Sequence, residues 1–321
     1  MNTTELAIIG LGGVGGYFGF KLATHYAGSP AVRITFLARG QTYEAVRQNG
    51  LTLLSAEHEN AGAHPFRLVA EPGELAPADI ILICVKNYDL EPLCRQLQAV
   101  IRPGTVLLPL MNGVDIQERI SALLPTAVVL PACVYVASHL KACGVVEHKG
   151  NPGKIIFGPD PGHPAYDARP VLELLRGAGI DADYQPDPLP AIWLKFLFIA
   201  SFGLVSARYN QPIGAVLAEP ELQARARRLV LEMTAIARAK GVALPDDSPA
   251  LVWQKAASFP YHTPTSLQLD VHSGRPHTEL ELFAGAVLAY GRRLGLPVVE
   301  TRKIYQEIKS QLAQRVAKQE H

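Results

Sequence analysis

The first half of the chain alternates short apolar runs with amphipathic segments. Residues 14–26 place Phe18, Leu22 and Tyr26 on one face of a predicted helix. Apolar runs typical of buried strands lie at residues 6–9, 33–37, 80–85 and 105–110. Because such runs, separated by helices, indicate a parallel sheet with both faces covered, we predict a Rossmann-type, doubly wound α/β sheet in this half.

The pattern changes after residue 132. Residues 133–157 contain shorter β-prone pieces separated by Gly and Pro, which indicate added, partly antiparallel strands. Residues 184–190, YQPDPLP, hold three prolines that oppose regular structure, so this segment is predicted to be a linker. We therefore expect two domains, residues 1–186 and residues 187–321.

The second half has the period of helices. The segment 221–240 carries Leu222, Leu229 and Met233 at helical spacing and ends at Gly241, a typical helix stop. Further helices are predicted at residues 191–207, 249–257 and 278–294, and from residue 300 into the C-terminal tail. The predicted architecture is an α/β domain followed by an all-helical domain.

The net charge and the composition limit the kinds of partner that we expect. A formal net charge of +1 over 321 residues favours neither a nucleic acid nor a membrane surface. A hydrophobic fraction of 48% is enough to build substantial cores. The one basic run, Arg225, Arg227 and Arg228, is interpreted as the solvated face of its helix.

The cysteines and histidines give no metal signature, so we expect no metal site. The cysteines lack CxxC spacing and are interpreted as core-filling thiols in a reducing compartment: Cys84, Cys94, Cys133 and Cys143. The spacing of His262, His272 and His277 fits no standard metal site. The opening MNTTELAIIG does not resemble a signal peptide, and the apolar run 191–207 is short for a membrane span. A cytoplasmic protein is expected.

Lys195 is the only charged residue of the apolar segment 191–207, AIWLKFLFIASFGLVSA. A helix with this sequence would be buried nearly all round, where an ammonium group is costly unless it is paired or hydrogen-bonded. Lys195 could therefore serve chemistry. The alternative is that its side chain extends past Trp193 to solvent.

A glycine-rich loop follows the first strand at residues 10–16, GLGGVGG. It contains G-x-G-x-x-G between a strand and a helix, the context that a dinucleotide-binding loop requires. Gly10 would allow the tight turn, Gly12 the approach of a pyrophosphate, and Gly15 close packing of helix and strand. The alternative is a tight turn without ligand. The predicted cofactor-binding residues here are Gly10, Leu11, Gly12, Gly13, Val14 and Gly15.

Arg39 stands near the end of the second strand, where an NAD site usually has Asp or Glu. A guanidinium suits the 2′-phosphate of NADP(H) through charge-assisted hydrogen bonds. NADP(H) is therefore the expected cofactor, with a solvent-facing arginine as the alternative.

The chain resembles the ketopantoate reductase family, also called 2-dehydropantoate 2-reductases, over nearly its whole length. The resemblance rests on the ordered combination of the glycine loop, Arg39, Val85-Lys86, Asn112-Gly113, Trp193-x-Lys195 and Ser266-x-x-x-Asp270…His277-Thr278-Glu279. It implies reduction of a 2-oxo acid with NADPH in pantothenate biosynthesis. It also implies an NADP-binding first domain and a second domain that holds substrate and catalytic groups.

The resemblance assigns roles to single residues. It implies that Lys195 hydrogen-bonds the carbonyl and supplies the proton, and burial would lower the pKa of this lysine towards neutrality. Glu279 would orient Lys195 and contact the substrate; without the resemblance it is an exposed glutamate at a helix start. Ser266 would contact the substrate carboxylate, or else cap the helix that begins at Leu267. Lys86 and Asn112 would contact both cofactor and substrate; otherwise they are a solvated strand end and a turn residue.

The chain departs from the family pattern at four positions. Asparagines expected four and eight residues after the catalytic lysine are replaced by Ile199 and Gly203, and another by Thr263. Met111 stands where the family usually has Gln. A site built on hydrogen bonds rejects analogues that lack them, so losing amides indicates a change of substrate.

We therefore expect an NADPH-dependent reductase of a small 2-oxo acid, with 2-dehydropantoate as the leading substrate and pantoate as its product. A different oxo acid, an imine or a secondary alcohol is the alternative within enzymes. A non-catalytic NADP(H)-binding sensor is the alternative from another class. Whether the protein is a homodimer stays open.

Overall fold

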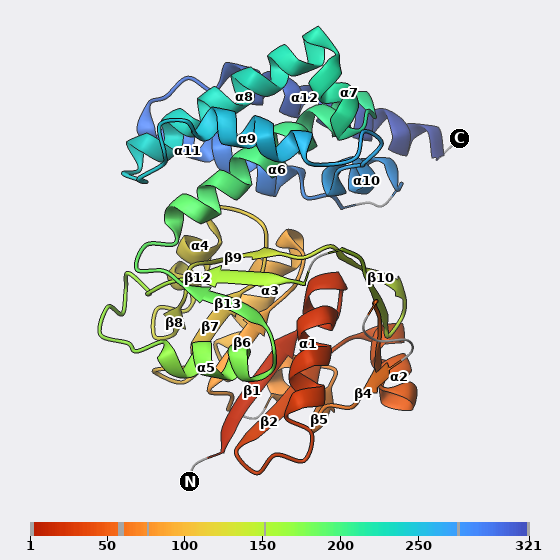
Figure 1. Ribbon diagram of the computed structural model, residues 1–321, viewed down its shortest axis with the longest axis vertical. Helices are drawn as coiled ribbons and strands as arrows, with labels where there is room; N and C mark the ends of the chain where they lie inside the picture. Colours follow the sequence, from red (N-terminus) through yellow and green to blue (C-terminus); the bar gives the residue numbers. More distant parts are fainter. Residues whose placement is uncertain (1–2, 57–60, 76, 151, 275–276, 320–321) are drawn as a thin grey trace. The chain divides into compact units, whose positions relative to one another are not determined.

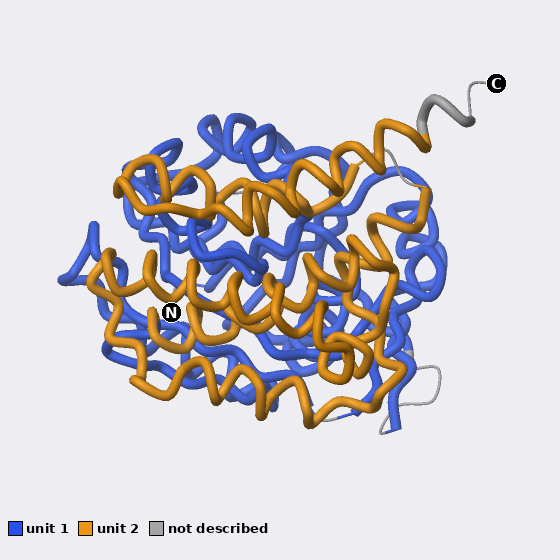
Figure 2. The backbone as a smooth tube through the Cα atoms, turned by 90° about the horizontal axis from the view of Figure 1, so that it is seen from above, with its two compact units in different colours: residues 1–188 blue, residues 189–321 orange. Residues whose placement is uncertain are grey.

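The computed structural model describes residues 3–56, 61–75, 77–150, 152–274 and 277–319. The chain divides into two compact units, residues 1–188 (unit 1) and 189–321 (unit 2), which Figure 2 shows in different colours. Unit 1 contains strands and helices, whereas the described part of unit 2 contains only helices and their connections (Figure 1). The predicted α/β fold with a helical C-terminal region is confirmed.

A six-stranded parallel sheet forms the centre of unit 1, in the order β5-β2-β1-β6-β7-β8 (Figure 1). Its strands are β1 (Thr4–Ile9), β2 (Val32–Leu37), β5 (Arg67–Val69), β6 (Ile80–Ile83), β7 (Val106–Pro109) and β8 (Val128–Val129). The chain moves from β1 outwards through β2 and β5, then returns to the other side of β1 with β6. Doubly wound sheets bind ligands at such a reversal, beyond the carboxyl ends of the strands.

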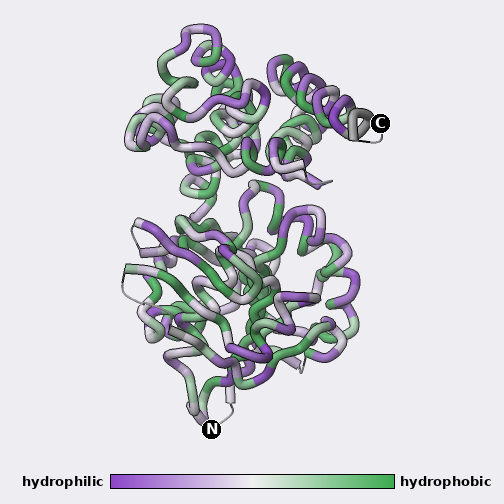
Figure 3. Tube along the Cα trace, turned by 90° about the vertical axis from the view of Figure 1, so that its right-hand side faces the viewer, coloured by the Kyte–Doolittle hydropathy of each residue, from purple (hydrophilic) through white to green (hydrophobic). Residues whose placement is uncertain are grey.

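The helices of unit 1 lie between its strands along the chain. They are α1 (Gly13–His25), α2 (Gly40–Asn49), η1 (Pro72–Glu74), α3 (Asn87–Leu97), α4 (Ile116–Leu123) and α5 (Arg169–Gly177). The strands β6 and β7 are buried along their whole length, which explains why their sequences are continuously apolar. Hydrophobic segments accordingly run through the interior of unit 1 in Figure 3.

Two smaller sheets complete unit 1. One has the order β10-β11-β3-β4 and the other the order β13-β12-β9. Their strands are β3 (Leu51–Leu54), β4 (Ala61–Ala63), β9 (Ala132–Tyr135), β10 (Ser138–Ala142), β11 (Val145–His148), β12 (Lys154–Phe157) and β13 (Asp181–Tyr184). The pairs β10–β11 and β9–β12 are antiparallel, whereas β11–β3 and β12–β13 are parallel. The expectation of partly antiparallel strands after residue 132 is confirmed.

The proline-rich segment is more ordered than predicted. Tyr184 is the last residue of β13, and the first helix of unit 2, α6 (Leu189–Tyr209), already includes Pro190. Proline is tolerated in the first turn of a helix because the amide it lacks would have no partner there. The prediction that all of residues 184–190 is irregular was therefore wrong, and only residues 185–188 lie outside regular elements.

Unit 2 is a helical domain. Besides α6 it contains α7 (Ile213–Ala218), α8 (Pro220–Ala239), α9 (Ser248–Ala257), α10 (Ser266–His272), η2 (Glu281–Gly285), α11 (Ala286–Leu294) and α12 (Val299–Gln319). The predicted helix at residues 278–294 begins later, and its first turns form the π-helix η2. There the amide of Ala286 bonds the carbonyl of Glu281, five residues earlier. A pattern of period 3.6 does not reveal this wider turn.

The helix α6 is the core of unit 2. Among the described residues it is the one helix long and apolar enough to cross a membrane, but 67% of its most apolar window is buried within the protein. The helix is longer than the apolar run 191–207 because it extends to 21 residues, so its length alone does not argue against a span. Its burial against α8, α9, α10 and α12 is that of a core helix.

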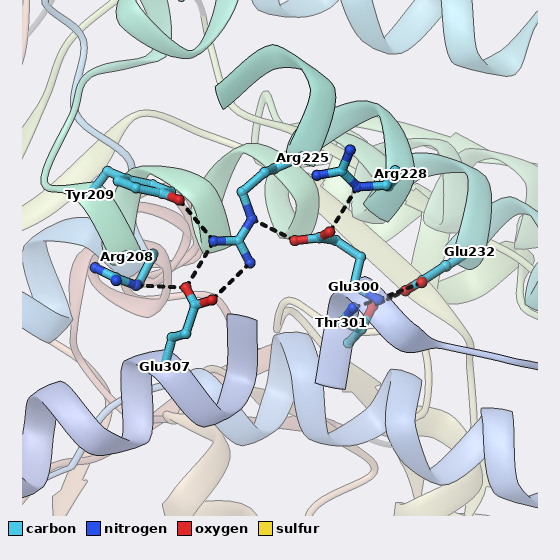
Figure 4. A network of polar contacts seen from close by, with 8 residues as sticks. All are labelled: Arg208, Tyr209, Arg225, Arg228, Glu232, Glu300, Thr301 and Glu307. Atoms are coloured by element: carbon cyan, nitrogen blue, oxygen red, sulfur yellow. Dashed lines mark hydrogen bonds and ion pairs between the residues drawn. The ribbon is translucent and has the colours of Figure 1, made fainter. Parts of the chain in front are cut away.

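A network of ion pairs joins α6, α8 and α12 (Figure 4). Arg225, 6% exposed, donates from Nε to Glu300, from Nη1 to the Tyr209 hydroxyl at 2.9 Å, and from Nη1 to Glu307 at 2.8 Å. Burial alone would lower the pKa of Arg225, but these hydrogen bonds outweigh it and raise that pKa. Arg208 donates to Glu307 at 2.7 Å from the end of α6.

The first turn of α12 is held by α8. The Glu232 carboxylate accepts hydrogen bonds from the amides of Glu300 and Thr301 at 2.7 and 2.9 Å. These amides have no partner within their own helix, so Glu232 caps α12 from a neighbouring helix (Figure 4). The hydrogen bonds of Glu232 and those of Arg225 together fix the position of α12 on α8.

The expectation that the basic run is a solvated face was wrong for Arg225. Arg228 is exposed yet bonds Glu300 at 2.7 Å, and Arg227 stacks on the Trp253 ring with its guanidinium carbon 4.5 Å from the centroid. The carboxylate partners of Arg225 lie 75 and 82 residues away in sequence, so local spacing could not reveal them.

Replacing Arg225 with Met should lower the free energy of unfolding by about 3 kcal/mol. This is the lower end of the range for broken buried ion pairs, because Arg228 would still pair with Glu300. Urea unfolding followed by circular dichroism measures the change. The matched control is Arg227→Met on the same helix, which should cost under about 1 kcal/mol; equal losses in both variants would contradict the structural role of the network.

Candidate active site

Four predicted cofactor residues follow neighbouring strands at one edge of the parallel sheet. Gly10 follows β1, Arg39 follows β2, Lys86 follows β6 and Asn112 follows β7. The register aligns the strand ends, because Ile9 pairs with both Leu37 and Ile83, and Ile83 with Pro109. The carboxyl ends of parallel strands meet at one edge, so the fold of unit 1 brings these four positions together.

The glycine loop has the geometry that its sequence predicts. Gly10 has φ +91°, a conformation that other residues rarely adopt, and Gly12 precedes the first turn of α1. A Cβ atom on Gly15 would lie 2.0 Å from the Gly10 carbonyl oxygen, so only glycine permits this approach of α1 to β1. A Cβ atom on Gly12 would meet nothing within 4 Å.

This open space at Gly12 fits a dinucleotide. The first amides of α1 have no partners within the helix, and the positive end of the helix dipole lies beside them. A pyrophosphate could therefore approach the backbone at Gly12 and accept hydrogen bonds from the start of α1. The residues that would hold it are Gly10 to Gly15, as the sequence predicts.

Two glycines have a purpose that the loop motif does not indicate. A Cβ atom on Gly13 would lie 2.4 Å from the carbonyl oxygen of Ser138 in β10, and one on Gly16 would lie 2.3 Å from Val146 in β11. The helix α1 thus packs on the sheet β10-β11-β3-β4 as well as on the central sheet. Gly13 and Gly16 are required by this second contact, which could not be read from a phosphate-binding motif.

Arg39 is exposed and occupies the N-cap position of α2. Its Nη2 donates a hydrogen bond to Gln96 Oε1 of α3 at 3.1 Å. The guanidinium thus lies beyond the end of β2, between α2 and α3. Its role toward a 2′-phosphate stays a prediction.

Lys86 and Asn112 are both half-buried. Lys86 is the N-cap residue of α3, and its carbonyl accepts the amide of Asp89 at 2.9 Å. Asn112 precedes Gly113, whose φ of +118° requires glycine and turns the chain towards α4. The two side chains thus come from two short loops at adjacent strand ends.

The four cysteines, all within the described residues, form no disulfide, but only part of the core-filling interpretation holds. Cys94 and Cys133 are buried, whereas Cys143 is exposed, so the interpretation was wrong for Cys143. Cys84 is half-buried beneath the glycine loop, with its Cβ 2.8 Å from the position of a Cβ on Gly15. Burial raises the pKa of Cys84 to about 12, so this thiol stays protonated and is a poor nucleophile at neutral pH.

Lys195 lies on the less buried face of α6. The half-buried residues in this part of the helix are Ala191, Leu194, Lys195 and Ile199. Lys195 follows Leu194 directly and lies four residues, about one helical turn, from both Ala191 and Ile199. The remaining residues from Ile192 to Ala207 are buried. The segment is therefore not buried all round, and its one charged residue is at the stripe where a ligand could reach it.

Glu279 is buried, with 5% of its surface exposed, in the turn before η2. The alternative of an exposed glutamate at a helix start is therefore wrong. The helix α6, which carries Lys195, packs on η2, which begins two residues after Glu279, because the Phe196 ring stacks on Phe283 with centroids 6.2 Å apart. Unit 2 thus holds an amine on α6 and a buried carboxylate just before an element that contacts α6.

Ser266 is exposed at the first position of α10. The helix is capped by Thr265, whose hydroxyl accepts the Gln268 amide at 3.2 Å, so Ser266 is not the cap. Leu267 of α10 lies on α6, because a Cβ on Gly203 would be 3.6 Å from Leu267 Cβ. A side chain larger than that of alanine at position 203 would collide with Leu267 unless it turned away from it.

No group of three or more His, Cys, Asp or Glu side chains in the described parts of the chain could hold a metal ion. His272 makes contacts within unit 2 that join helices. One ring nitrogen lies 2.9 Å from the Ala207 carbonyl oxygen, and the other accepts from Arg315 Nη2 at 2.7 Å. This histidine joins α10 to α6 and α12.

Alanine substitutions in the glycine loop should separate packing from ligand binding. Gly15→Ala should lower the melting temperature strongly because its methyl group would overlap the Gly10 carbonyl. Gly12→Ala should leave the free energy of unfolding within about 0.5 kcal/mol of wild type and still weaken NAD(P)H binding. Thermal unfolding and fluorescence titration measure the two effects; unaltered NAD(P)H affinity in Gly12→Ala would argue against a pyrophosphate at this loop.

Two protein-family models match the chain. The model described as ketopantoate reductase PanE/ApbA matches residues 6–162, and the model of the C-terminal part of the same family matches residues 187–311. Together the matched residues span well over half of the chain.

Relatives extend over most of the sequence. A 2-dehydropantoate 2-reductase of Mycobacterium tuberculosis is 31% identical over 235 residues, covering 72% of this chain and 76% of the relative. The uncharacterized oxidoreductase YkpB of Bacillus subtilis is 28% identical over 302 residues, covering 92% of this chain and 96% of the relative.

Solved structures share the fold. A PanE/ApbA family ketopantoate reductase from Ralstonia eutropha is 26% identical with a TM-score of 0.86, covering 97% of this chain and 99% of that one. Two structures at lower identity show the fold alone. D-mandelate dehydrogenase with NADH and anilino(oxo)acetate has a TM-score of 0.83 at 17% identity, covering 97% and 99%. A dimeric ketopantoate reductase from Staphylococcus aureus has a TM-score of 0.78 at 21% identity, covering 97% and 99%.

Proposed function

Because the chain belongs to the ketopantoate reductase family, a family of oxidoreductases that act on C=O and CH–OH groups with NAD(P)H, we propose that it reduces a small 2-oxo acid with NADPH. The leading substrate is 2-dehydropantoate, which would give pantoate for pantothenate biosynthesis. The observation that carries the proposal is Lys195, the one charged residue of the apolar segment 191–207 within α6, on the less buried stripe of that helix.

Carbonyl reduction needs a hydride on carbon and a proton on oxygen, and the nicotinamide supplies the hydride. Lys195 would hydrogen-bond the carbonyl oxygen and deliver the proton to it. The buried Glu279 would orient the ammonium and contact the substrate, and the exposed Ser266 would bind the substrate carboxylate.

The cofactor would lie along the carboxyl edge of the central sheet. The amides at the glycine loop would bind the pyrophosphate, and Arg39 the 2′-phosphate. Lys86 and Asn112, at adjacent strand ends, would contact both nicotinamide ribose and substrate. The aligned strand ends support this arrangement.

A different substrate is the second candidate. Ile199 and Gly203 follow Lys195 on α6 at positions four and eight, and neither offers a side-chain hydrogen bond. An apolar surface beside the proton donor favours a 2-oxo acid with an apolar side chain over the hydroxylated ketopantoate. An imine or a secondary alcohol remains within this candidate.

Binding without catalysis is the alternative from another class. A sensor of NADP(H) would keep the glycine loop and Arg39 but would have no use for a lysine in the core helix. The proposal also includes a cytoplasmic location. A homodimer is proposed by analogy with the dimeric enzyme of S. aureus.

Lys195→Met should lower kcat for 2-oxo-acid reduction by about 10²–10⁴-fold, the range of a general acid. NADPH affinity should change little, because the predicted cofactor residues all belong to unit 1. The control is Lys255→Met, an exposed lysine of α9 that should leave kcat unchanged. If wild-type protein binds NADPH but oxidises it with no member of a broad oxo-acid panel, the sensor is favoured.

Arg39→Ala should weaken NADPH about 10–100-fold while NADH affinity stays nearly constant, since a charged hydrogen bond contributes roughly 1.5–3 kcal/mol. Dissociation constants from nucleotide fluorescence give the comparison. Arg47→Ala removes an exposed arginine of α2 that pairs with Glu44 and should affect neither nucleotide. Equal loss of affinity for both nucleotides would rule out the 2′-phosphate role.

Ile199→Asn should shift substrate preference towards hydroxylated 2-oxo acids. The ratio of kcat/KM for ketopantoate to kcat/KM for an alkyl 2-oxo acid should rise about tenfold, the effect of one added hydrogen bond. Leu231→Asn, at a solvent-exposed position of α8, is the control. An unchanged ratio would remove residue 199 from substrate selection.

A further inference from the structure

Two short loops of unit 1 carry the residues proposed to contact both cofactor and substrate. One loop joins β6 to α3 and ends at Lys86; the other joins β7 to α4 and contains Asn112. Their parent strands are neighbours, and Ile83 pairs with Pro109 at the strand ends. The last residue beyond β7 that bonds β6 is Leu110, whose amide donates to the Ile83 carbonyl at 2.9 Å, and the two loops continue from there.

The side chain of Arg119 connects the two helices that follow these loops. It belongs to α4, and its Nη1 donates a short hydrogen bond to Oδ1 of Asn87 in α3. The same nitrogen lies 3.9 Å from Oδ2 of Asp115. Asn87 directly follows Lys86, and Asp115 lies three residues after Asn112 at the N-cap position of α4.

The environment of Arg119 makes this contact more than a surface ion pair. Asn87 is only 9% exposed, and the side chains of Arg119 and Asp115 are 33% and 20% exposed. Burial raises the pKa of Cys94 of α3 to about 11, and the charge of Arg119 opposes that rise. Interactions of a partly buried charge are screened less than those at a surface.

We propose that Arg119 is a positioning residue that fixes the distance between Lys86 and Asn112. The inference rests on the proposed function, which places these two residues in the binding site. Binding groups must be held to within about 0.5 Å of their productive positions by the shell behind them. Arg119 reaches Asn87, the residue that starts α3, and thereby couples the start of α3 to the loop that leads into α4.

The test compares Arg119→Met with Arg95→Met, which removes an exposed arginine of α3 that pairs with Glu91. The measurements are the dissociation constant for NADPH, kcat and KM for the 2-oxo acid that wild type reduces, and the melting temperature. Arg119→Met should raise both the NADPH dissociation constant and the substrate KM about tenfold, the effect of one charged hydrogen bond. Arg95→Met should match wild type.

Three further results separate positioning from general destabilisation. The pH dependence of kcat should not change in Arg119→Met, because the proposed proton donor belongs to unit 2. Asn87→Ala should raise the same two constants, and the double variant should be no worse than either single one, because both remove one interaction. Asn87→Asp keeps an acceptor oxygen for the guanidinium and should retain near-wild-type values.

Wild-type constants in Arg119→Met, or additive effects in the double variant, would overturn the proposal. If Arg119→Met does not fold, the comparison of Asn87→Ala with Asn87→Asp decides. Equal NADPH dissociation constants and equal KM values in those two variants would also overturn the proposal. The proposed function fails separately, if wild type reduces no 2-oxo acid. In that case NADPH binding by the same variants still decides whether Arg119 positions the loops.

Discussion

The approach of α1 to β1 is the constraint on which the arrangement of unit 1 depends. The two elements meet where Gly15 faces the carbonyl of Gly10, at a distance that leaves no room for a Cβ atom. This contact directs the first amides of α1 over the end of the sheet, and the aligned strands bring Arg39, Lys86 and Asn112 to the same edge. Gly13 and Gly16 then allow the sheet β10-β11-β3-β4 to pack on α1 as well.

Much of the fold could be predicted from the sequence because its signals are local. Buried parallel strands are continuous apolar runs, and the glycine loop has a fixed spacing between strand and helix. Long-range contacts could not be predicted in this way. Arg225 is buried because it meets carboxylates from α12, and nothing near residue 225 in sequence indicates them. The π-helix at residues 281–285 has no local signal either, since its residues suit an ordinary helix.

In the candidate site, too, some features could be predicted from the sequence and others could not. Residue types and motif order suggested Lys195, Glu279 and the strand-end residues, but not their surroundings. The burial of Glu279 and the half-buried stripe of α6 follow from helix packing, and that packing makes Gly203 a neighbour of Leu267. Arg119 carried no signal in the sequence, because an arginine at the fourth position of a short helix is ordinary until its hydrogen bond to Asn87 is seen.

The uneven exposure of the cysteines makes the chain suited to spectroscopic labelling. Cys94 and Cys133 are buried and Cys84 has a strongly raised pKa, whereas Cys143 is exposed in the turn between β10 and β11. A maleimide dye should therefore attach at Cys143 without any engineered substitution. Because the small sheet packs against α1, such a dye would report on the helix at the glycine loop while leaving that loop chemically intact.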